Sequence, residues 1–194
     1  MIIDCHTHAF PDAVAPRALE AIGTRGGFRP VLDGTVASLL RGMDQAGIDK
    51  AIQLNIATRA DQFRSILAFC KAIRSDRLTP FPSVHPDDPQ CRDHLRAIAG
   101  EGFRGIKLHP YYQQFTLDEE RLFPLYAALI DEGLALIAHT GYDISYPFDD
   151  RCGPRRIAAV LDRFPGLRFS TSHLGAWYDY DAVRRHLVGR PVGM

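Results

Sequence analysis

The 194-residue sequence predicts a parallel α/β protein, and three observations support this prediction. Short apolar runs alternate with longer segments of helical spacing, which is the pattern of βαβ units. After the first run, successive runs begin roughly 25 to 35 residues apart, the length of one strand and one helix. Apolar residues make up 46% and charged residues 24% of the chain, which excludes a disordered or fibrous chain.

Six strands are expected, because six short runs are rich in branched and aromatic residues. The third run contains Pro80 and Pro82, which lack a backbone N–H, so we expect an irregular strand there. The six predicted strands cover residues 2–5, 50–56, 78–84, 103–108, 134–138 and 167–172.

Six helices are expected, one after each strand. Gly47 and Gly133 end two of these segments, and Pro154 and Pro165 bracket a third. The predicted helices cover residues 36–46, 61–73, 89–99, 117–132, 155–164 and 179–187. We interpret the Gly- and Pro-rich residues 10–35 as an insertion after the first strand, and residues 1–194 as one domain.

Charge and cysteine content exclude several classes of partner and compartment. The 23 basic and 23 acidic residues balance, so nucleic acid and anionic membranes are not expected partners. No apolar stretch approaches the ~20 residues of a membrane span. The four cysteines are scattered and no signal peptide precedes the first strand, so we expect reduced thiols and a cytoplasmic protein.

Histidines gather at the ends of the predicted strands. Random placement would put fewer than one of the eight histidines in short windows at these ends, whereas six lie there. Residues just beyond the carboxyl ends of parallel strands converge on the ligand site, and imidazole is the commonest metal ligand. The pattern therefore predicts a metal centre. The six histidines are His6, His8, His85, His109, His139 and His173.

His6 and His8 share one face of the first strand, because side chains on a strand alternate with period 2. One ion can accept both rings. Asp4 lies on the same face, where it would either orient a histidine or form a structural hydrogen bond below the site.

Lys107 and His109 share a face of the fourth strand. Lys107 is either a buried lysine paired with a carboxylate or a lysine close to the metal. His85, next to Pro86, is expected to bond locally. The helical residues His94 and His186 are expected to be solvated.

Aromatic residues follow the last three predicted strands. They would either wall a pocket for a ring-shaped or unsaturated substrate or pack the loops among themselves. These residues are Tyr111, Tyr112, Tyr142, Tyr146, Trp177, Tyr178 and Tyr180.

Four ordered motifs resemble the amidohydrolase superfamily. Residues 3–8 (IDCHTH) resemble its opening strand. Residues 105–110 (GIKLHP), 138–141 (AHTG) and 172–175 (SHLG) resemble its amidohydrolase-related branch, which includes metal-dependent decarboxylases and lactonases. The resemblance implies a (β/α)8 TIM barrel with the metal at the carboxyl ends of the strands, of which this chain holds about six of eight βα units.

The resemblance also implies roles for individual residues. His6, His8 and His139 match the family's metal ligands, and we expect Zn²⁺. His173 matches the histidine that polarises the substrate or moves a proton, and His109 is a second candidate catalytic residue. Lys107 matches a position where two-metal members carry a bridging lysine, and we favour one metal here.

The chain departs from the family pattern at its C-terminus. The family carries a further metal-site Asp after its eighth strand, and no Asp here matches it. Asp179 and Asp181 are expected instead to cap a helix. We therefore expect a fragment of a longer protein, a chain completed by another chain, or a degenerate member.

The resulting functional prediction is a metal-dependent hydrolase that acts on a small carboxylated, amide or lactone substrate through metal-activated water. The alternatives are a carboxy-lyase of the same branch and a non-catalytic remnant. A phosphoesterase that opens with the same His-x-His motif fits the later motifs less well. The expected partner is a small molecule, with a second copy of the chain as a further candidate.

Overall fold

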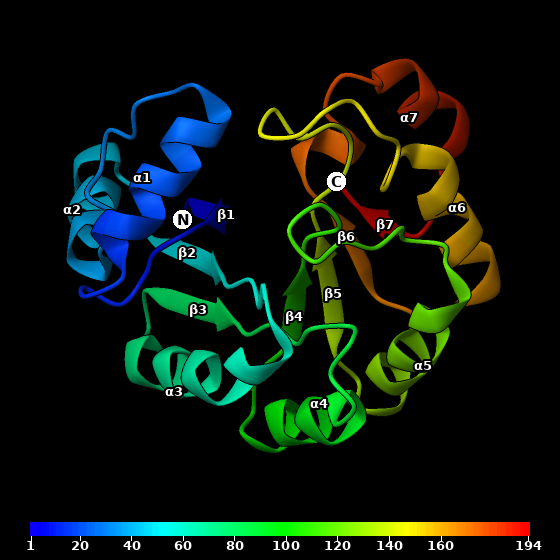
Figure 1. The fold of residues 1–194 in the computed structure, drawn as a ribbon, viewed down its shortest axis with the longest axis horizontal. Helices are drawn as coiled ribbons and strands as arrows, with labels where there is room; N and C mark the ends of the chain where they lie inside the picture. Colours follow the sequence, from blue (N-terminus) through cyan, green and yellow to red (C-terminus); the bar gives the residue numbers. More distant parts are fainter.

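The computed structural model describes residues 1–194 and confirms the predicted class of fold. Its strands are parallel and lie in two sheets that curve around a common interior, with helices outside (Figure 1). The first sheet has the order β1 (Ile3–Thr7), β2 (Lys50–Leu54), β3 (Leu78–Phe81). The second has the order β4 (Gly105–Leu108), β5 (Ala135–Ala138), β6 (Phe169–Thr171), β7 (Val192–Gly193).

The two sheets meet between β3 and β4, where prolines interrupt the ladder. Pro80 and Pro82 have no N–H to donate, as expected from the sequence. One backbone hydrogen bond still joins the two sheets, from the N–H of Lys107 to the carbonyl of Pro82 (2.8 Å). The Ser83 hydroxyl donates to the Lys107 carbonyl (2.8 Å). The strand ends of both sheets therefore stay at one edge of a partial barrel.

The six predicted helices are confirmed, with shifted ends. The predicted helix at residues 117–132 is a 3₁₀ turn, Glu120–Leu122, followed by a shorter α-helix. The helices are α2 (Val36–Ala46), α3 (Phe63–Ile73), α4 (Cys91–Gly100), α5 (Phe123–Asp131), α6 (Pro154–Arg163) and α7 (Tyr180–His186). Two further 3₁₀ turns are Ala60–Gln62 and His173–Gly175.

Two elements were not predicted. The helix α1 (Ala15–Gly26) lies inside the stretch interpreted as an irregular insertion, and the two-residue β7 pairs with β6. The signals for α1 are a proline in its first turn and Gly27, which takes a left-handed φ of 67° at its C-cap.

Local caps define where helices begin. The Thr35 side chain accepts a hydrogen bond from the Ser38 N–H at the start of α2. Asp179 accepts one from the Ala182 N–H at the start of α7, which confirms its expected capping role.

The apolar core is uneven. A cluster of 29 buried residues packs the second sheet against α3 to α7, whereas the cluster beneath α2 has five buried residues. Inside the partial barrel, Leu54, Phe81 and Ile137 form a third small cluster. Most of the buried apolar area therefore belongs to the part of the chain after residue 62.

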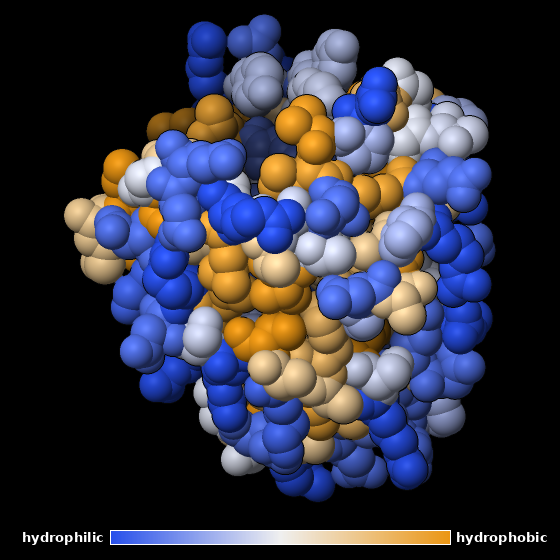
Figure 2. All heavy atoms as spheres, turned by 90° about the vertical axis from the view of Figure 1, so that its left-hand side faces the viewer, coloured by the Kyte–Doolittle hydropathy of each residue, from blue (hydrophilic) through white to orange (hydrophobic).

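β1 and β7 are the outer strands of the partial barrel, which does not close (Figure 1). Ile2 and Ile3 remain 59% and 45% exposed. Figure 2 views the side of the molecule that carries α1 and α2, and shows hydrophobic surface gathered between hydrophilic borders. No helix is both long enough and apolar enough to cross a bilayer.

Candidate metal centre

Five of the strand-end histidines come together at the carboxyl edge of the two sheets. His6 lies in β1 and His8 one residue beyond it. His109 follows β4, His139 follows β5 and His173 lies two residues beyond β6. The parallel topology thus gathers residues that are up to 167 positions apart in the sequence.

His6 and His8 present their Nε2 atoms to each other at 3.2 Å. Two nitrogen ligands of one tetrahedral Zn²⁺ lie about 3.3 Å apart, given bonds of about 2.0–2.1 Å. The Nδ1 of His8 lies 2.9 Å from the Leu54 carbonyl, which leaves Nε2 free for a ligand.

His109, His139 and His173 form the other side of the cluster. The rings of His109 and His139 stack with centroids 4.2 Å apart. The His139 Nδ1 and His173 Nε2 atoms are 3.3 Å apart. His173 also bridges to the first sheet, because its ring centroid lies 5.2 Å from that of His6.

Asp143 joins this cluster, and the sequence analysis missed it. One donor atom each from His109, His139 and Asp143 lies within 4.8 Å of the other two, and all three residues are buried. The Asp143 Oδ2 is 3.3 Å from the His109 Nε2. The signal available in the sequence was its place in the loop after the fifth strand, four residues beyond His139.

Two ring nitrogens in the cluster have no hydrogen-bond partner although they are buried. They are the Nδ1 of His109 and the Nε2 of His139. A buried polar atom without a partner costs about 1–3 kcal/mol, so such atoms call for a ligand. Ring nitrogens of neutral imidazoles are the atoms through which histidines bind divalent cations.

Burial also keeps these imidazoles neutral, which is the form that binds metal. Desolvation lowers the pKa of His6 to about 2, with Lys107 and the neighbouring histidines acting in the same direction. Desolvation likewise lowers the pKa of His109, His139 and His173.

Lys107 lies fully buried beneath the cluster. Its Nζ donates to the Ser172 Oγ at 3.1 Å, and no carboxylate lies within 4 Å to form an ion pair. Burial lowers its pKa to about 7. Of the two interpretations of Lys107, the buried lysine paired with a carboxylate is therefore wrong.

The backbone at His173 is held in an uncommon conformation. His173, Leu174 and Gly175 have φ values of 57°, 54° and 96°, a run of left-handed residues that costs free energy outside glycine. Gly175 is required there, because a Cβ would lie 2.8 Å from the Val183 side chain on α7. The turn fixes the direction in which His173 leaves β6.

Two other polar residues from the sequence analysis have local roles. The Asp4 carboxylate accepts from the His6 backbone N–H (2.9 Å) and so braces the strand. His85 accepts from the Asp87 N–H, which confirms its expected local bond.

The expectation that His94 is solvated is wrong. His94 stacks on Phe63 at 3.7 Å between ring centroids and lies 2.6 Å from the buried Asp88 carboxylate. Its place on the inner side of α4 is a packing role that the helical pattern did not reveal.

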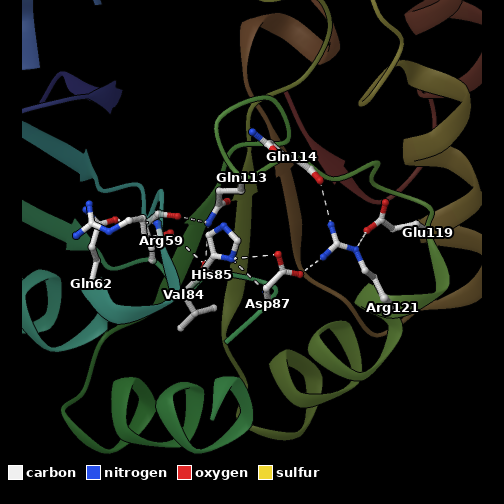
Figure 3. Close-up of polar contacts among 11 residues, drawn as sticks. Arg59, Gln62, Val84, His85, Asp87, Gln113, Gln114, Glu119 and Arg121 are labelled. Atoms are coloured by element: carbon white, nitrogen blue, oxygen red, sulfur yellow. Dashed lines mark hydrogen bonds and ion pairs between the residues drawn. The ribbon is translucent and has the colours of Figure 1, made fainter. Parts of the chain in front are cut away.

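Gln113 ties three strand-end loops together. Its side-chain oxygen accepts from the His109 N–H (2.8 Å), and its Nε2 donates to the carbonyls of Ala57 and Val84 (2.8 and 2.9 Å). Figure 3 shows this residue beside a chain of contacts in which Arg121 joins Asp87, Glu119 and Gln114. The backbone that carries His109 is thereby fixed to its neighbours.

A cavity of about 1340 Å³ opens over the histidines, and five histidines of the cluster line it. Tyr112, Tyr146 and Trp177 line it as well, which confirms the expected aromatic wall for these three residues. Tyr111 is buried instead, where its hydroxyl donates to the Asp149 carbonyl.

Comparison with known proteins supports the family and the fold. The family model described as amidohydrolase matches residues 3–188. A comparison with curated proteins found no significant match. A TIM-barrel protein of Bordetella bronchiseptica has a similar structure, with a TM-score of 0.71 and 22% identity over 95% of this chain and 72% of that chain.

Two enzymes also have similar structures. An IDCase of Metarhizium anisopliae aligns with a TM-score of 0.65 and 17% identity, over 97% of this chain and 72% of that chain. A 5-carboxyvanillate decarboxylase of Novosphingobium aromaticivorans, solved with manganese and 4-hydroxy-3-methoxy-5-nitrobenzoic acid, aligns with a TM-score of 0.64 and 18% identity, over 100% of this chain and 74% of that chain. At these identities the likeness concerns the fold.

Proposed function

The chain belongs to the amidohydrolase family, and from that premise we propose that it is a metal-dependent hydrolase of a small carboxylated, amide or lactone substrate. The observation that carries this proposal is the pair of buried, unpartnered nitrogens on His109 and His139 at the edge where five histidines meet. A divalent cation is the ligand that such a set of neutral imidazoles and one carboxylate suits best.

Two overlapping sets of ligands are open to this ion. The family motifs favour His6, His8 and His139. The compact trio of His109, His139 and Asp143 is favoured by its donor distances. His139 belongs to both sets, so we propose it as the central ligand.

The ion, when bound, would lower the pKa of a water molecule and polarise the substrate. His173 lines the cavity beside His139, where its ring would donate a hydrogen bond to the oxyanion that forms on a carbonyl oxygen. The left-handed turn holds that ring in place during the reaction. Burial lowers the pKa of Lys107 to about 7, so the charge that it places beneath the site depends on pH near neutrality.

A carboxy-lyase is the second candidate function. Its support is the structural likeness to a decarboxylase that binds manganese and a nitrobenzoic acid. In this reaction the bond from carbon to a carboxylate breaks, carbon dioxide leaves, and the remaining electron pair takes a proton. His173, a neutral imidazole that lines the cavity, would relay that proton from a solvent water molecule.

Elemental analysis of metal-loaded protein tests the proposal and separates the ligand sets. We expect the wild-type chain to retain about one equivalent of zinc or manganese after dialysis and His139→Ala to retain none. The double variant His6→Ala and His8→Ala loses the ion if the motif set is right. Asp143→Asn weakens retention if the compact trio is right.

A wild-type chain that retains no divalent ion would refute the metal site. Retained metal without hydrolysis or decarboxylation of any carboxylated, amide or lactone substrate would favour the non-catalytic remnant. Carbon dioxide release, as opposed to acid release on hydrolysis, distinguishes the two enzymatic functions.

A further inference from the structure

One face of α1 lines the cavity above the histidines. The lining residues of this segment fall at spacings of 3, 4, 7, 8 and 11 from the first, which is one stripe of a helix. They are exposed or half-buried, because they face the open cavity and not the core. The stripe consists of Val14, Arg17, Ala18, Ala21, Ile22 and Arg25.

The far end of α1 reaches the opposite wall of the cavity. A Cβ added at Gly26 would lie 3.4 Å from the Ile144 side chain, in the loop after β5. Asp143 belongs to the same loop. The stripe is therefore held across from the histidine cluster.

The charges in this cavity are unbalanced. Arg17, Arg25 and Asp143 are the formally charged residues among its lining. Asp143 faces the His109 ring at 3.3 Å. Neither arginine has a carboxylate within 4 Å, although most other arginines of the chain do. Two unpaired cations in a concave site attract an anion.

Arg25 lies close to the aromatic wall. Burial raises the pKa of Tyr146, and the charge of Arg25 is the largest influence that opposes the rise. The same charge acts in the same direction on Tyr112. Both phenols line the same cavity as Arg25, so a group bound at Arg25 would lie on their side of it.

The rest of the lining suits a flat apolar body. Six aromatic rings face the cavity, and Ala18 and Ala21 leave space between the arginines. Flat rings pack well between aromatic walls. The rings belong to Phe10, Phe28, Phe69, Tyr112, Tyr146 and Trp177.

We propose that Arg25, assisted by Arg17, binds a carboxylate of the substrate, and that the cavity takes a flat aromatic or unsaturated dicarboxylate. The guanidinium plane matches a carboxylate in two parallel hydrogen bonds. The second polar group of the substrate would reach the histidines, and this part of the proposal rests on the proposed function.

Binding of isophthalate tests the proposal, with the neutral isophthalamide as its matched control. Trp177 is the single tryptophan of the chain and lines the cavity, so its fluorescence reports occupancy. We expect isophthalate to bind at least tenfold more tightly than isophthalamide. Arg25→Gln should weaken isophthalate binding about tenfold or more, and Arg17→Gln by less.

Arg29→Gln is the matched control variant, because it removes the same charge from a residue near α1 that does not line this cavity. It should leave the Kd for isophthalate unchanged. Unchanged binding in Arg25→Gln, equal binding of the two probes, or no binding of isophthalate would each overturn the proposal.

Titration in EDTA separates this proposal from the metal-centre proposal. Charge-selective binding in EDTA that depends on Arg25 would support the anchor without any metal. If the same chain also retains no divalent ion after dialysis from metal-containing buffer, the proposed function alone is refuted. Full metal retention, with isophthalate binding that neither arginine substitution changes, would support the metal centre and refute the anchor.

Discussion

His173 occupies a position in the cluster that differs from that of the other histidines. It lies on a strained turn, lines the cavity and contacts His139. The trio of buried donors does not include it. It can therefore act on the substrate without being required to hold the ion.

This position predicts a separation between metal binding and turnover. His173→Asn should keep most of the bound metal and reduce kcat/KM by about a hundredfold or more, as expected for loss of a positioned donor. Metal analysis and steady-state kinetics on the same preparation check this. Loss of metal in parallel with activity would instead make His173 a ligand.

The sequence was sufficient to predict the histidine cluster but not Asp143. Five of the six strand-end histidines meet as one rule predicts, that parallel strands present their carboxyl ends at one edge, whereas His85 bonds locally. Asp143 belongs to an irregular loop, where no periodicity says which way a side chain points. Its approach to His109 depends on how that loop folds back over the cavity.

At the scale of elements, the loops after β5 and β6 are joined at Gly141. This residue forms a bridge with Trp177 and has a φ of 82°. A Cβ there would lie 2.2 Å from the Trp177 backbone nitrogen. The close approach carries Trp177 and Asp143 to the same side of the cavity.

Gly141→Ala should therefore lower the free energy of unfolding by about 4 kcal/mol or more. Gly133→Ala is the control, because Gly133 also has a positive φ (62°) but has no atom within 4 Å of its Cβ position. This control should cost about 1 kcal/mol, the strain of the backbone alone. Urea unfolding measures both, and equal losses would contradict the steric argument.

Helix α1 shows why one element escaped prediction. The glycines and prolines of residues 10–35 favoured an irregular stretch, and the apolar stripe of α1 is broken by Arg17 and Arg25. A stripe that faces a cavity carries charges that a core-facing stripe does not. The two arginines that obscure the helical pattern are also the residues for which we propose a role in binding.

At the scale of the whole molecule, the half-buried His6 and the buried His109 and His139 couple stability to pH. In the folded chain their pKa values lie below the ordinary value of about 6.5, so between that pH and the folded pKa the unfolded chain binds more protons. The free energy of unfolding is therefore highest above pH 6.5, where these histidines are neutral in both states, and it decreases as the pH falls.

We expect the Tm of the metal-free chain to decrease steadily from about pH 7 to about pH 5, with up to ~1.4 kcal/mol per pH unit from each fully buried histidine. His186→Asn, a change on α7 away from the cavity, should leave the slope unchanged. A Tm that is flat over this range would contradict the burial of the cluster.

The outer edge of β1 should promote self-association. Its backbone groups have one partner strand, and Ile3 is 45% exposed. Ile3→Lys should reduce association at high concentration in light scattering, because charge blocks pairing at a sheet edge. Val31→Lys removes an even more exposed apolar residue outside any strand and should have a smaller effect.

The uneven core implies that one part of the molecule unfolds locally before the whole molecule unfolds. Regions with few buried contacts open locally at a lower free energy than the global transition. Amide protons of β1 and β2 should therefore exchange with solvent faster than those of β4 and β5, with the proline-interrupted junction at β3 as the boundary. His6 and His8 belong to the first sheet, which should open first. His109 and His139 belong to the second sheet, which should stay folded longer. A ligand bound by histidines of both sheets would link the two sheets and raise the free energy of local opening of β1. The resulting decrease in the amide exchange rate of β1 would measure this stabilisation.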